Sequence, residues 1–346
     1  MSLSPRERVK AQVNHQDTDI LPYTLSFEED VARRLDKYYG DPSWRYLIDE
    51  AIVFLPLPSE GLIWGDLTET VYVDLYGTQW RVDQRIPHVN KPALQQPTLD
   101  NFTFPEVDAV FKLGWKDQAL QVIEQRKDYF LIGYLGMGVF ERSWALRGFE
   151  EALVDAIAHP SFYDELVEQI TFHQLAIIER LLDLPIDGIL FTDDWGYQQG
   201  VILGPERWRR YLKPRLARLF SRVHDAGKHV LAHCCGSIVD ILPDLIEIGL
   251  EVYESVQPEA KNNNPYELKS RHGNRLTFWG GLGSQSIIPF GTPQEIHREV
   301  RKLCQEMGRG GGYILAPAKE IQIDTPTENA AAVLEAFLNQ TGVKFP

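Results

Sequence analysis

The sequence predicts a single (β/α)8 barrel, and three observations lead to this prediction. From residue 129 onward, short β-rich runs alternate with longer helical patterns, as they do in parallel βα units. Two further apolar runs lie nearer the N-terminus and bring the expected strands to eight, the number that closes such a barrel. The alternative is a doubly wound open sheet, which normally carries a glycine-rich phosphate loop after its first strand. This sequence has no such loop there.

The 346 residues have the length of one barrel with extra loops, so we expect one domain over 1–346. The expected strands are apolar runs at 20–27, 51–55, 129–135, 187–191, 228–232, 250–254, 276–280 and 312–316. Longer helical patterns occupy 28–50, 151–182, 205–226 and 292–307. An N-terminal helical extension is expected from Pro5 to about His15, because Ser4 suits an N-cap and proline suits the first helical position.

Residues 56–110 differ in composition from the rest and are rich in proline, threonine and aromatic residues. Within them, 70–74 and 78–82 flank Tyr76-Gly77 in a pattern typical of a β-hairpin. The segment has too few apolar residues for a core of its own. We therefore interpret it as an insertion that covers the mouth of the barrel.

Composition excludes several classes of partner. The net charge of −14 repels phosphate backbones and anionic lipids, so nucleic acids and membrane surfaces are poor partners. No apolar run is long enough to span a membrane, and the N-terminus has no apolar segment typical of a signal peptide. Of the three cysteines, two are adjacent, which does not form a disulfide framework and favours a reducing cytoplasm.

The active sites of such barrels lie where strands run into their following loops. Five acidic, basic or metal-ligating groups follow expected strands at these points: Asp193 with Asp194, His233 with Cys235, Glu254, Lys319 and Glu320. The loop His233-Cys234-Cys235-Gly236 is the sharpest of these signals. In an extended segment His233 and Cys235 project to one side, and an imidazole nitrogen and a thiolate so placed can chelate one zinc ion. A buried histidine beside two small apolar cysteines is the alternative reading.

The remaining rim residues allow more than one role. Asp193 and Asp194 can bind a metal, position a proton or hold a hydroxyl, or one of them can cap the next turn. Glu254 either completes a metal shell or forms a salt bridge at the rim. Lys319 and Glu320 either take part in the site or pair with each other in solvent.

Several of these segments, in this order, resemble the uroporphyrinogen decarboxylase superfamily, and within it the corrinoid-linked methyltransferases. The resemblance is strongest over 129–335. The matching stretches are 193–198 (Asp-Asp-Trp-Gly-Tyr-Gln), 213–215 (Lys-Pro-Arg), 233–238 (His-Cys-Cys-Gly-Ser-Ile), 280–282 (Gly-Gly-Leu), 311–317 (Gly-Gly-Tyr-Ile-Leu-Ala-Pro) and 324–329 (Asp-Thr-Pro-Thr-Glu-Asn).

The resemblance implies a (β/α)8 barrel and a zinc ion held by His-x-Cys and a later cysteine. His233 and Cys235 match the first two ligands, but Lys319 stands where we expect the later cysteine. If a metal binds, Glu254, Glu320 or an aspartate must replace that ligand. Alternatively, the Lys319 cation replaces the charge of the metal.

The resemblance also implies transfer of a methyl group between a small methylated substrate (an ether, thiol or amine) and a corrinoid protein. The corrinoid is expected on a separate partner, because this chain lacks an Asp-x-His-x-x-Gly motif. We expect Asp193, Asp194, Lys319 and Glu320 to be catalytic. Tyr23, Tyr72, Trp80, Trp195 and Gln198 are the expected substrate-binding residues, and the chain is compatible with a homodimer.

Two other functions stay open. The first is decarboxylation of a porphyrinogen or a smaller carboxylate. The segment 25–31 argues against a porphyrinogen, because Glu28, Glu29 and Asp30 stand where the decarboxylases carry an arginine-containing segment that neutralises substrate carboxylates. The second is a substrate-binding barrel without catalysis, which the absence of a cysteine at Lys319 supports.

Overall fold

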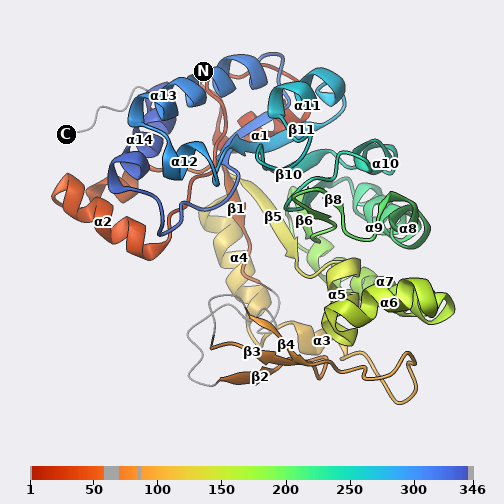
Figure 1. The fold of residues 1–346 in the computed structure, drawn as a ribbon. Coiled ribbons are helices and arrows are strands. Elements are labelled where there is room, and N and C mark those ends of the chain that lie inside the picture. The colour runs from red at the N-terminus through yellow and green to blue at the C-terminus, as the bar shows by residue number, and fades with distance from the viewer. Residues whose placement is uncertain (1, 58–69, 84–86, 342–346) are drawn as a thin grey trace.

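The computed structural model describes residues 2–57, 70–83 and 87–341, and it shows a curled parallel sheet surrounded by helices (Figure 1). Seven strands form the sheet in the order β1-β5-β6-β9-β10-β11-β12. Their bounds are β1 Ile52–Phe54, β5 Phe130–Leu135, β6 Gly188–Thr192, β9 His229–His233, β10 Val252–Val256, β11 Thr277–Leu282 and β12 Tyr313–Pro317. This confirms the predicted barrel-type fold.

The expected first strand, 20–27, is the exception. In the structure it is reduced to isolated bridges, from Tyr23 to Leu315 and from Phe27 to Ile321. Even so, 22–24 lies between the two edges of the sheet, because Thr24 N donates to Leu315 O at 3.1 Å and Ala51 N donates to Tyr23 O at 3.0 Å. Pro22 has no N–H to extend the ladder, which explains why the prediction of a full strand is wrong.

An N-terminal helix, α1 (Pro5–Val13), packs against the amino end of the barrel. It begins with the expected Ser4 cap, which forms a capping box with Glu7. Val9 and Val13 belong to a buried apolar cluster with residues from β1, β5, β6, β9, β10, β11 and β12. This cluster fills the inside of the barrel and leaves the carboxyl ends of the strands as its open end.

The outer helices are shorter than the sequence pattern predicts, because prolines interrupt the long helical stretches. The stretch 151–182 falls into α6 (Phe149–Ala158) and α7 (Pro160–Leu182), and 205–226 into α8 (Pro205–Tyr211) and α9 (Lys213–Asp225). The stretch 28–50 contains α2 (Glu29–Tyr39) and a 3-10 turn (Pro42–Leu47). The other main helices are α4 (Trp115–Gln125), α5 (Val139–Arg147), α10 (Leu242–Glu247), α11 (Pro265–His272), α13 (Pro293–Lys302) and α14 (Thr327–Leu338). Within the described ranges, no helix has both the length and the hydropathy needed to cross a bilayer.

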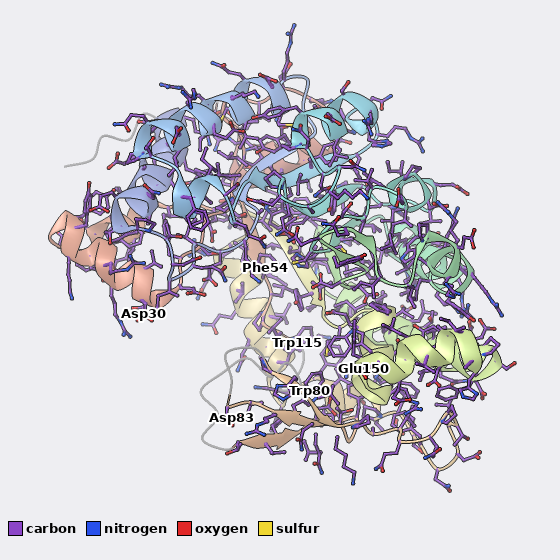
Figure 2. The ribbon with its side chains drawn as sticks, in the orientation of Figure 1. Asp30, Phe54, Trp80, Asp83, Trp115 and Glu150 are labelled. Carbon is purple, nitrogen blue, oxygen red and sulfur yellow. The ribbon has the colours of Figure 1, made fainter. Side chains whose placement is uncertain are left out.

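The insertion contains the expected hairpin. β2 (Val71–Val73) and β3 (Gln79–Arg81) pair antiparallel, and an unpredicted strand, β4 (His88–Lys91), adds to β3. The sheet packs on α5, where the Trp80 and Trp144 ring centroids are 6.1 Å apart and Thr78 Oγ1 donates to Ala145 O. Phe54, at the carboxyl end of β1, lies on the side of the barrel towards this sheet (Figure 2). Residues 58–69 and 84–86 of the insertion lie outside the described residues, and its role as a cover for the mouth stays a prediction.

A buried carboxylate fastens α1 to the barrel. Asp187, at the start of β6, accepts hydrogen bonds from the side chain of Arg6 and from Leu131 N, and it forms an ion pair with Lys10 at 2.9 Å. Burial alone would raise the pKa of Asp187, but Arg6, the Leu131 N–H and Lys10 outweigh it and hold the pKa below its usual range.

We therefore predict that Asp187→Asn lowers the free energy of unfolding by about 2 kcal/mol at neutral pH, a value reduced for the partial exposure of both cations. Because the pKa is depressed in the folded state, the carboxylate contributes fully above the ordinary aspartate pKa, and this contribution is lost as the pH falls through the folded value. Urea denaturation of the wild type and the variant, at neutral pH and at about pH 3, measures the difference in their free energies of unfolding. The exposed Asp240→Asn is the matched control. An equal loss at both pH values would contradict the prediction.

Candidate active site

The inner face of the barrel changes from apolar to polar towards its carboxyl end. Ile132, Leu190, Leu231 and Val252 belong to the buried interior cluster. Side chains alternate along a strand, so the residues two positions further on face the same interior one layer higher. Those residues are Tyr134, Thr192, His233 and Glu254.

The register of the parallel strands brings these polar residues side by side. Thr192 pairs with His233, and His233 pairs with Glu254. The Glu254 carboxylate contacts His233 Nδ1. The Nε2 atom on the other side of the ring faces Cys235 Sγ at 3.4 Å and Asp194 Oδ1 at 3.8 Å. The Glu254 carboxylate thus orients the His233 ring from one side. On the other side, the ring faces two atoms that can bind a metal, Cys235 Sγ and Asp194 Oδ1.

The loop after β6 delivers Asp194 to this point. Its Oδ1 accepts the Cys235 N–H at 2.8 Å, which ties the β6 loop to the β9 loop. Among the described residues, Asp194, His233 and Cys235 form a group whose ligand atoms all lie within 4.8 Å of one another. One imidazole nitrogen, one thiolate and one carboxylate oxygen are a donor set that suits zinc, and three protein ligands leave the fourth tetrahedral position open, as in catalytic zinc sites.

The glycine after the cysteines shapes this loop. Gly236 has φ +76°, and a Cβ there would lie 2.7 Å from the backbone of Tyr197. The close approach lets Ser237 N donate to Tyr197 O and joins the β9 loop to β7 (Gly196–Tyr197). Cys234 points the other way and accepts the Gly196 N–H, and burial raises the pKa of its thiol well above the usual value. Only Cys235 of the adjacent pair therefore belongs to the site.

Asp193 has a different environment from Asp194. Its buried carboxylate accepts Phe140 N at 3.0 Å and Glu141 N at 2.7 Å, so it caps the amino end of α5, and it also accepts the indole N–H of Trp195. A Cβ on Gly138 would lie 2.5 Å from this carboxylate, so the glycine makes the approach possible. Burial raises the pKa of Asp193 to about 7, although the three N–H donors oppose the shift.

The electrostatics of the site are dominated by acids. Burial lowers the pKa of His233, but Glu254 and the Cys235 thiol outweigh it and hold the pKa well above its usual value. Burial, followed by the charges of Asp193 and Asp194, raises the pKa of Glu141 well above its usual value. The candidate site therefore gathers several acidic groups around one imidazole, and burial makes two of these acids, Asp193 and Glu141, harder to ionise.

The five aromatic and polar residues expected to bind substrate lie in four separate places. Tyr23 packs outside the barrel against Phe337, at a ring distance of 5.9 Å, and Trp195 packs against Trp208 at 6.0 Å. Tyr72 and Trp80 face each other across β2 and β3, and Gln198 donates to Gln285 Oε1 at 3.2 Å. None of these contacts joins them to the group around His233, and their substrate role stays a prediction.

The sequence reading missed four residues of the polar end. Tyr134 and Thr192 hydrogen-bond to each other at 3.3 Å, and Phe54 and Trp279 are inward-facing rings 6.2 Å apart. The two-residue alternation of β1, β5, β6 and β11, counted from their buried inward residues, would have found all four. Glu141 is a fifth missed residue, and strand alternation could not have found it because it lies on a helix.

Comparisons with known proteins show the family of this chain. The sequence profile described as Uroporphyrinogen decarboxylase (URO-D) matches residues 71–339, which is most of the chain. The chain belongs to the uroporphyrinogen decarboxylase family. Uroporphyrinogen decarboxylase of Thermus thermophilus is 23% identical over 328 residues and covers 88% of this chain and 90% of that protein. The protein of the same name from Syntrophotalea carbinolica is 24% identical over 176 residues and covers 51% of this chain and 48% of that protein.

A methyltransferase from Methanosarcina mazei is a structural neighbour with a TM-score of 0.73. It covers 99% of this chain and 100% of that chain at 19% sequence identity. This likeness shows that the two proteins share a fold over their whole length.

Lys319 and Glu320 follow β12, in the part of the chain where the resemblance to the family led us to expect a cysteine. Ser284 Oγ donates to Lys319 O at 3.5 Å. Burial and the charge of Glu28 raise the pKa of Glu320, and Lys319 opposes this shift. Glu320 therefore lies at the rim, next to the start of α2, with Lys319 beside it, and the catalytic role of both residues stays a prediction.

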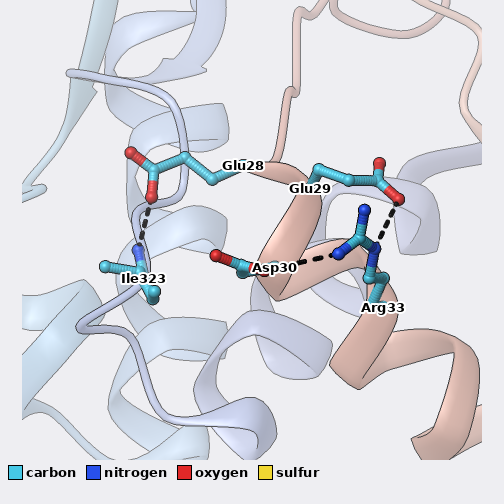
Figure 3. Close-up of a pocket in the computed structure, with 5 residues that line it drawn as sticks. All are labelled: Glu28, Glu29, Asp30, Arg33 and Ile323. Atoms are coloured by element: carbon cyan, nitrogen blue, oxygen red, sulfur yellow. Dashed lines mark hydrogen bonds and ion pairs between the residues drawn. The ribbon is translucent and has the colours of Figure 1, made fainter. Parts of the chain in front are cut away.

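The start of α2 is acidic, as the sequence indicated. Glu28, Glu29 and Asp30, with Arg33 and Ile323, line a hollow of about 530 Å³ (Figure 3). Glu28 accepts the Ile323 N–H at 2.9 Å, while Arg33 pairs with Glu29 at 3.4 Å and with Asp30 at 3.8 Å. The single arginine of this hollow is thus occupied by its own acidic neighbours.

The geometry predicts unequal reactivity of the three cysteines. Cys235 is partly exposed, whereas Cys234 is fully buried, and burial raises the pKa of Cys304 to about 11. In the metal-free native protein Cys235 should react with iodoacetamide at least about tenfold faster than the other two, because exposure and thiolate content control alkylation. Peptide mass spectrometry of a time course measures the three rates. The urea-unfolded protein is the control, in which the three rates should converge. Equal rates for Cys234 and Cys235 in the native protein would contradict the orientation described here.

Proposed function

We propose that this protein is a metal-dependent methyltransferase that moves a methyl group between a small methylated substrate and a corrinoid carried by a partner protein. One observation carries the proposal: Asp194, His233 and Cys235 converge on one point at the open end of the barrel with a zinc-type donor set. The fold shared with a methyltransferase from Methanosarcina mazei supports it.

Each residue of the group has a definite role in the proposal. Asp194, His233 and Cys235 would hold the ion. Glu254 accepts the Nδ1–H of His233, which fixes the tautomer and turns the Nε2 lone pair towards the ion. When bound, zinc supplies a Lewis acid that activates the methylated heteroatom or holds a deprotonated thiol acceptor. Asp193 has an indirect role, because it caps α5 and so positions Glu141 at the site.

The oxygen of Asp194 takes the place of the later cysteine that the resemblance implies. A site with one thiolate and one carboxylate donates less charge to zinc than a site with two thiolates, so the ion is a harder Lewis acid. This favours oxygen or nitrogen substrates over thiols as partners of the ion. Lys319, at the rim beside Glu320, is left to balance the acidic residues there.

Decarboxylation is the activity named for the sequence relatives, and the acids of this chain argue against it. A porphyrinogen carries several carboxylates, and Glu28, Glu29 and Asp30 would repel them at the rim. The purified protein incubated with uroporphyrinogen should therefore give no decarboxylated product. With zinc, a methylated substrate and cob(I)alamin, it should give methylcobalamin, which absorbs at a different wavelength. Decarboxylation without methyl transfer would overturn the proposal, as would ligand binding with neither reaction.

The metal step has its own prediction. The wild-type protein should bind one zinc ion per chain, and His233→Ala should abolish tight binding. Glu254→Gln should weaken zinc binding by about 10- to 100-fold, because an outer-shell carboxylate orients the ligand without touching the ion. Metal analysis and competition with a chromophoric chelator measure both effects, and far-ultraviolet circular dichroism confirms that the variants are folded. A wild-type protein that folds but binds no zinc under these conditions would contradict the proposal that the methyl transfer depends on a metal.

A further inference from the structure

We infer that Gln257 is a positioning residue of the candidate site, although it is not one of the three residues that would touch the metal. Its side-chain amide holds the loop after β9, residues 233–237. In this orientation of the loop, Cys235 faces the His233 imidazole, and Cys234 faces away from it. The expected effect on zinc rests on the proposed function, whereas the effect on the two cysteines is measurable without a metal.

Two adjacent cysteines make the orientation of this loop important. Both residues carry the same side chain, so side-chain chemistry does not select which thiol meets the imidazole. β9 ends at His233, and beyond it the direction of each side chain depends on how the loop backbone is held. Gly236 then turns the chain with φ +76°. The hydrogen bonds of the loop backbone therefore decide which cysteine belongs to the site.

Neighbouring backbone holds the loop at both of its ends. Cys234 N donates to Glu254 O at 2.7 Å, which continues the contact between β9 and β10. Ser237 N donates to Tyr197 O at 2.9 Å, which joins the loop to β7. Two N–H groups lie between these bonds, and side chains hold both of them.

The two side-chain acceptors are of different kinds. Cys235 N donates to Asp194 Oδ1 at 2.8 Å, and Asp194 is itself a member of the group that would bind the metal. Gly236 N donates to Gln257 Oε1 at 3.0 Å. The glutamine amide has no charge and lies outside the metal-binding group. It can therefore hold the loop in the same way before and after a metal binds.

Gln257 is itself held in place. It directly follows β10 and is only 8% exposed. Its backbone carbonyl accepts hydrogen bonds from Asn263 Nδ2 at 2.9 Å and from Ala260 N at 3.2 Å. The Tyr253 hydroxyl donates to Gly236 O at 3.5 Å and so contacts the same turn. An acceptor fixed in this way orients its partner without losing further conformational freedom.

Removal of this acceptor would leave the Gly236 N–H buried without a partner. Gly236 is buried, and an unpaired buried N–H is costly, so the peptide would rotate to find another acceptor or water. Rotation would carry Cys235 Sγ away from His233 Nε2, which now lies 3.4 Å from it. The same movement would loosen the packing of Cys234. Gln257 thus controls the difference between the two thiols.

The test compares two variants of Gln257. Gln257→Met keeps the length of the side chain and removes the acceptor, whereas Gln257→Glu keeps an oxygen at the same reach. Peptide mass spectrometry of the metal-free folded protein measures the ratio of the iodoacetamide alkylation rates of Cys235 and Cys234. We expect Gln257→Met to lower this ratio at least about fivefold and Gln257→Glu to keep it within about twofold of the wild type.

Zinc binding provides a second measurement. Gln257→Met should weaken zinc binding about tenfold, because residues that orient a ligand from outside the metal shell have effects of this size. Gln257→Glu should not weaken it. Competition with a chromophoric chelator measures both affinities, and far-ultraviolet circular dichroism shows whether each variant is folded.

The chain offers a matched control in Gln12. This is another buried glutamine whose Oε1 accepts a backbone N–H, that of Tyr313 at 3.0 Å, but it lies in α1 at the amino end of the barrel. Gln12→Met should therefore lower stability without changing the alkylation ratio or the zinc affinity. Gln257→Asn, whose oxygen is one methylene too short for Gly236 N, takes the place of Gln257→Met if that variant does not fold.

Three results would overturn the inference: an unchanged ratio in folded Gln257→Met or Gln257→Asn, an equal fall in Gln257→Glu, or an equal fall in Gln12→Met. The outcome is separable from that of the proposed function. If the wild type binds no zinc but Gln257→Met still lowers the ratio, the positioning role stands and the metal-dependent function fails. If zinc binds and methylcobalamin forms while the ratio is unchanged, the function stands and the role of Gln257 is wrong.

Discussion

The register of three parallel strands determines which polar side chains meet at the candidate site. Thr192, His233 and Glu254 occupy neighbouring positions on β6, β9 and β10, and the two-residue alternation turns all three to the inside of the barrel. A shift by one residue would send the imidazole outward among the helices. The buried apolar layer beneath, with Leu190, Leu231 and Val252, fixes that register, so packing in the core positions a polar group at the surface.

The two adjacent aspartates show how one loop serves structure and chemistry. Asp193 is buried and caps α5, which brings the backbone of Glu141 to the site, while Asp194 remains partly exposed and faces His233 and Cys235. The first carboxylate is stabilised by N–H donors, whereas among the described residues the only cationic group beside the second is the His233 imidazole. Unbalanced acids at one place destabilise a protein unless a cation binds there, and a metal ion held by Asp194 would supply such a cation.

The seven strands of the sheet begin and end within two residues of the sequence prediction, because buried parallel strands read as short apolar runs. The pairing of His233 with Cys235 was also predictable from the sequence, since strand ends and alternation locate both residues without coordinates. Two features could not be predicted from the sequence, because they depend on tertiary structure. Pro22 limits the first strand to single bridges, so hydrogen bonding overrides its apolar pattern. Glu141 lies on a helix whose direction is set by a cap from Asp193, 52 residues away in the chain.

Zinc K-edge X-ray absorption of the loaded protein tests the central claim most directly, because it counts the sulfur ligands of the ion. Coordination by Asp194, His233 and Cys235 predicts a single sulfur scatterer at about 2.3 Å and the remaining shell of nitrogen and oxygen at about 2.0 Å. Two sulfurs would mean that Cys234 turns inward with Cys235, and none would mean that the ion binds elsewhere. Either result would contradict the site described here.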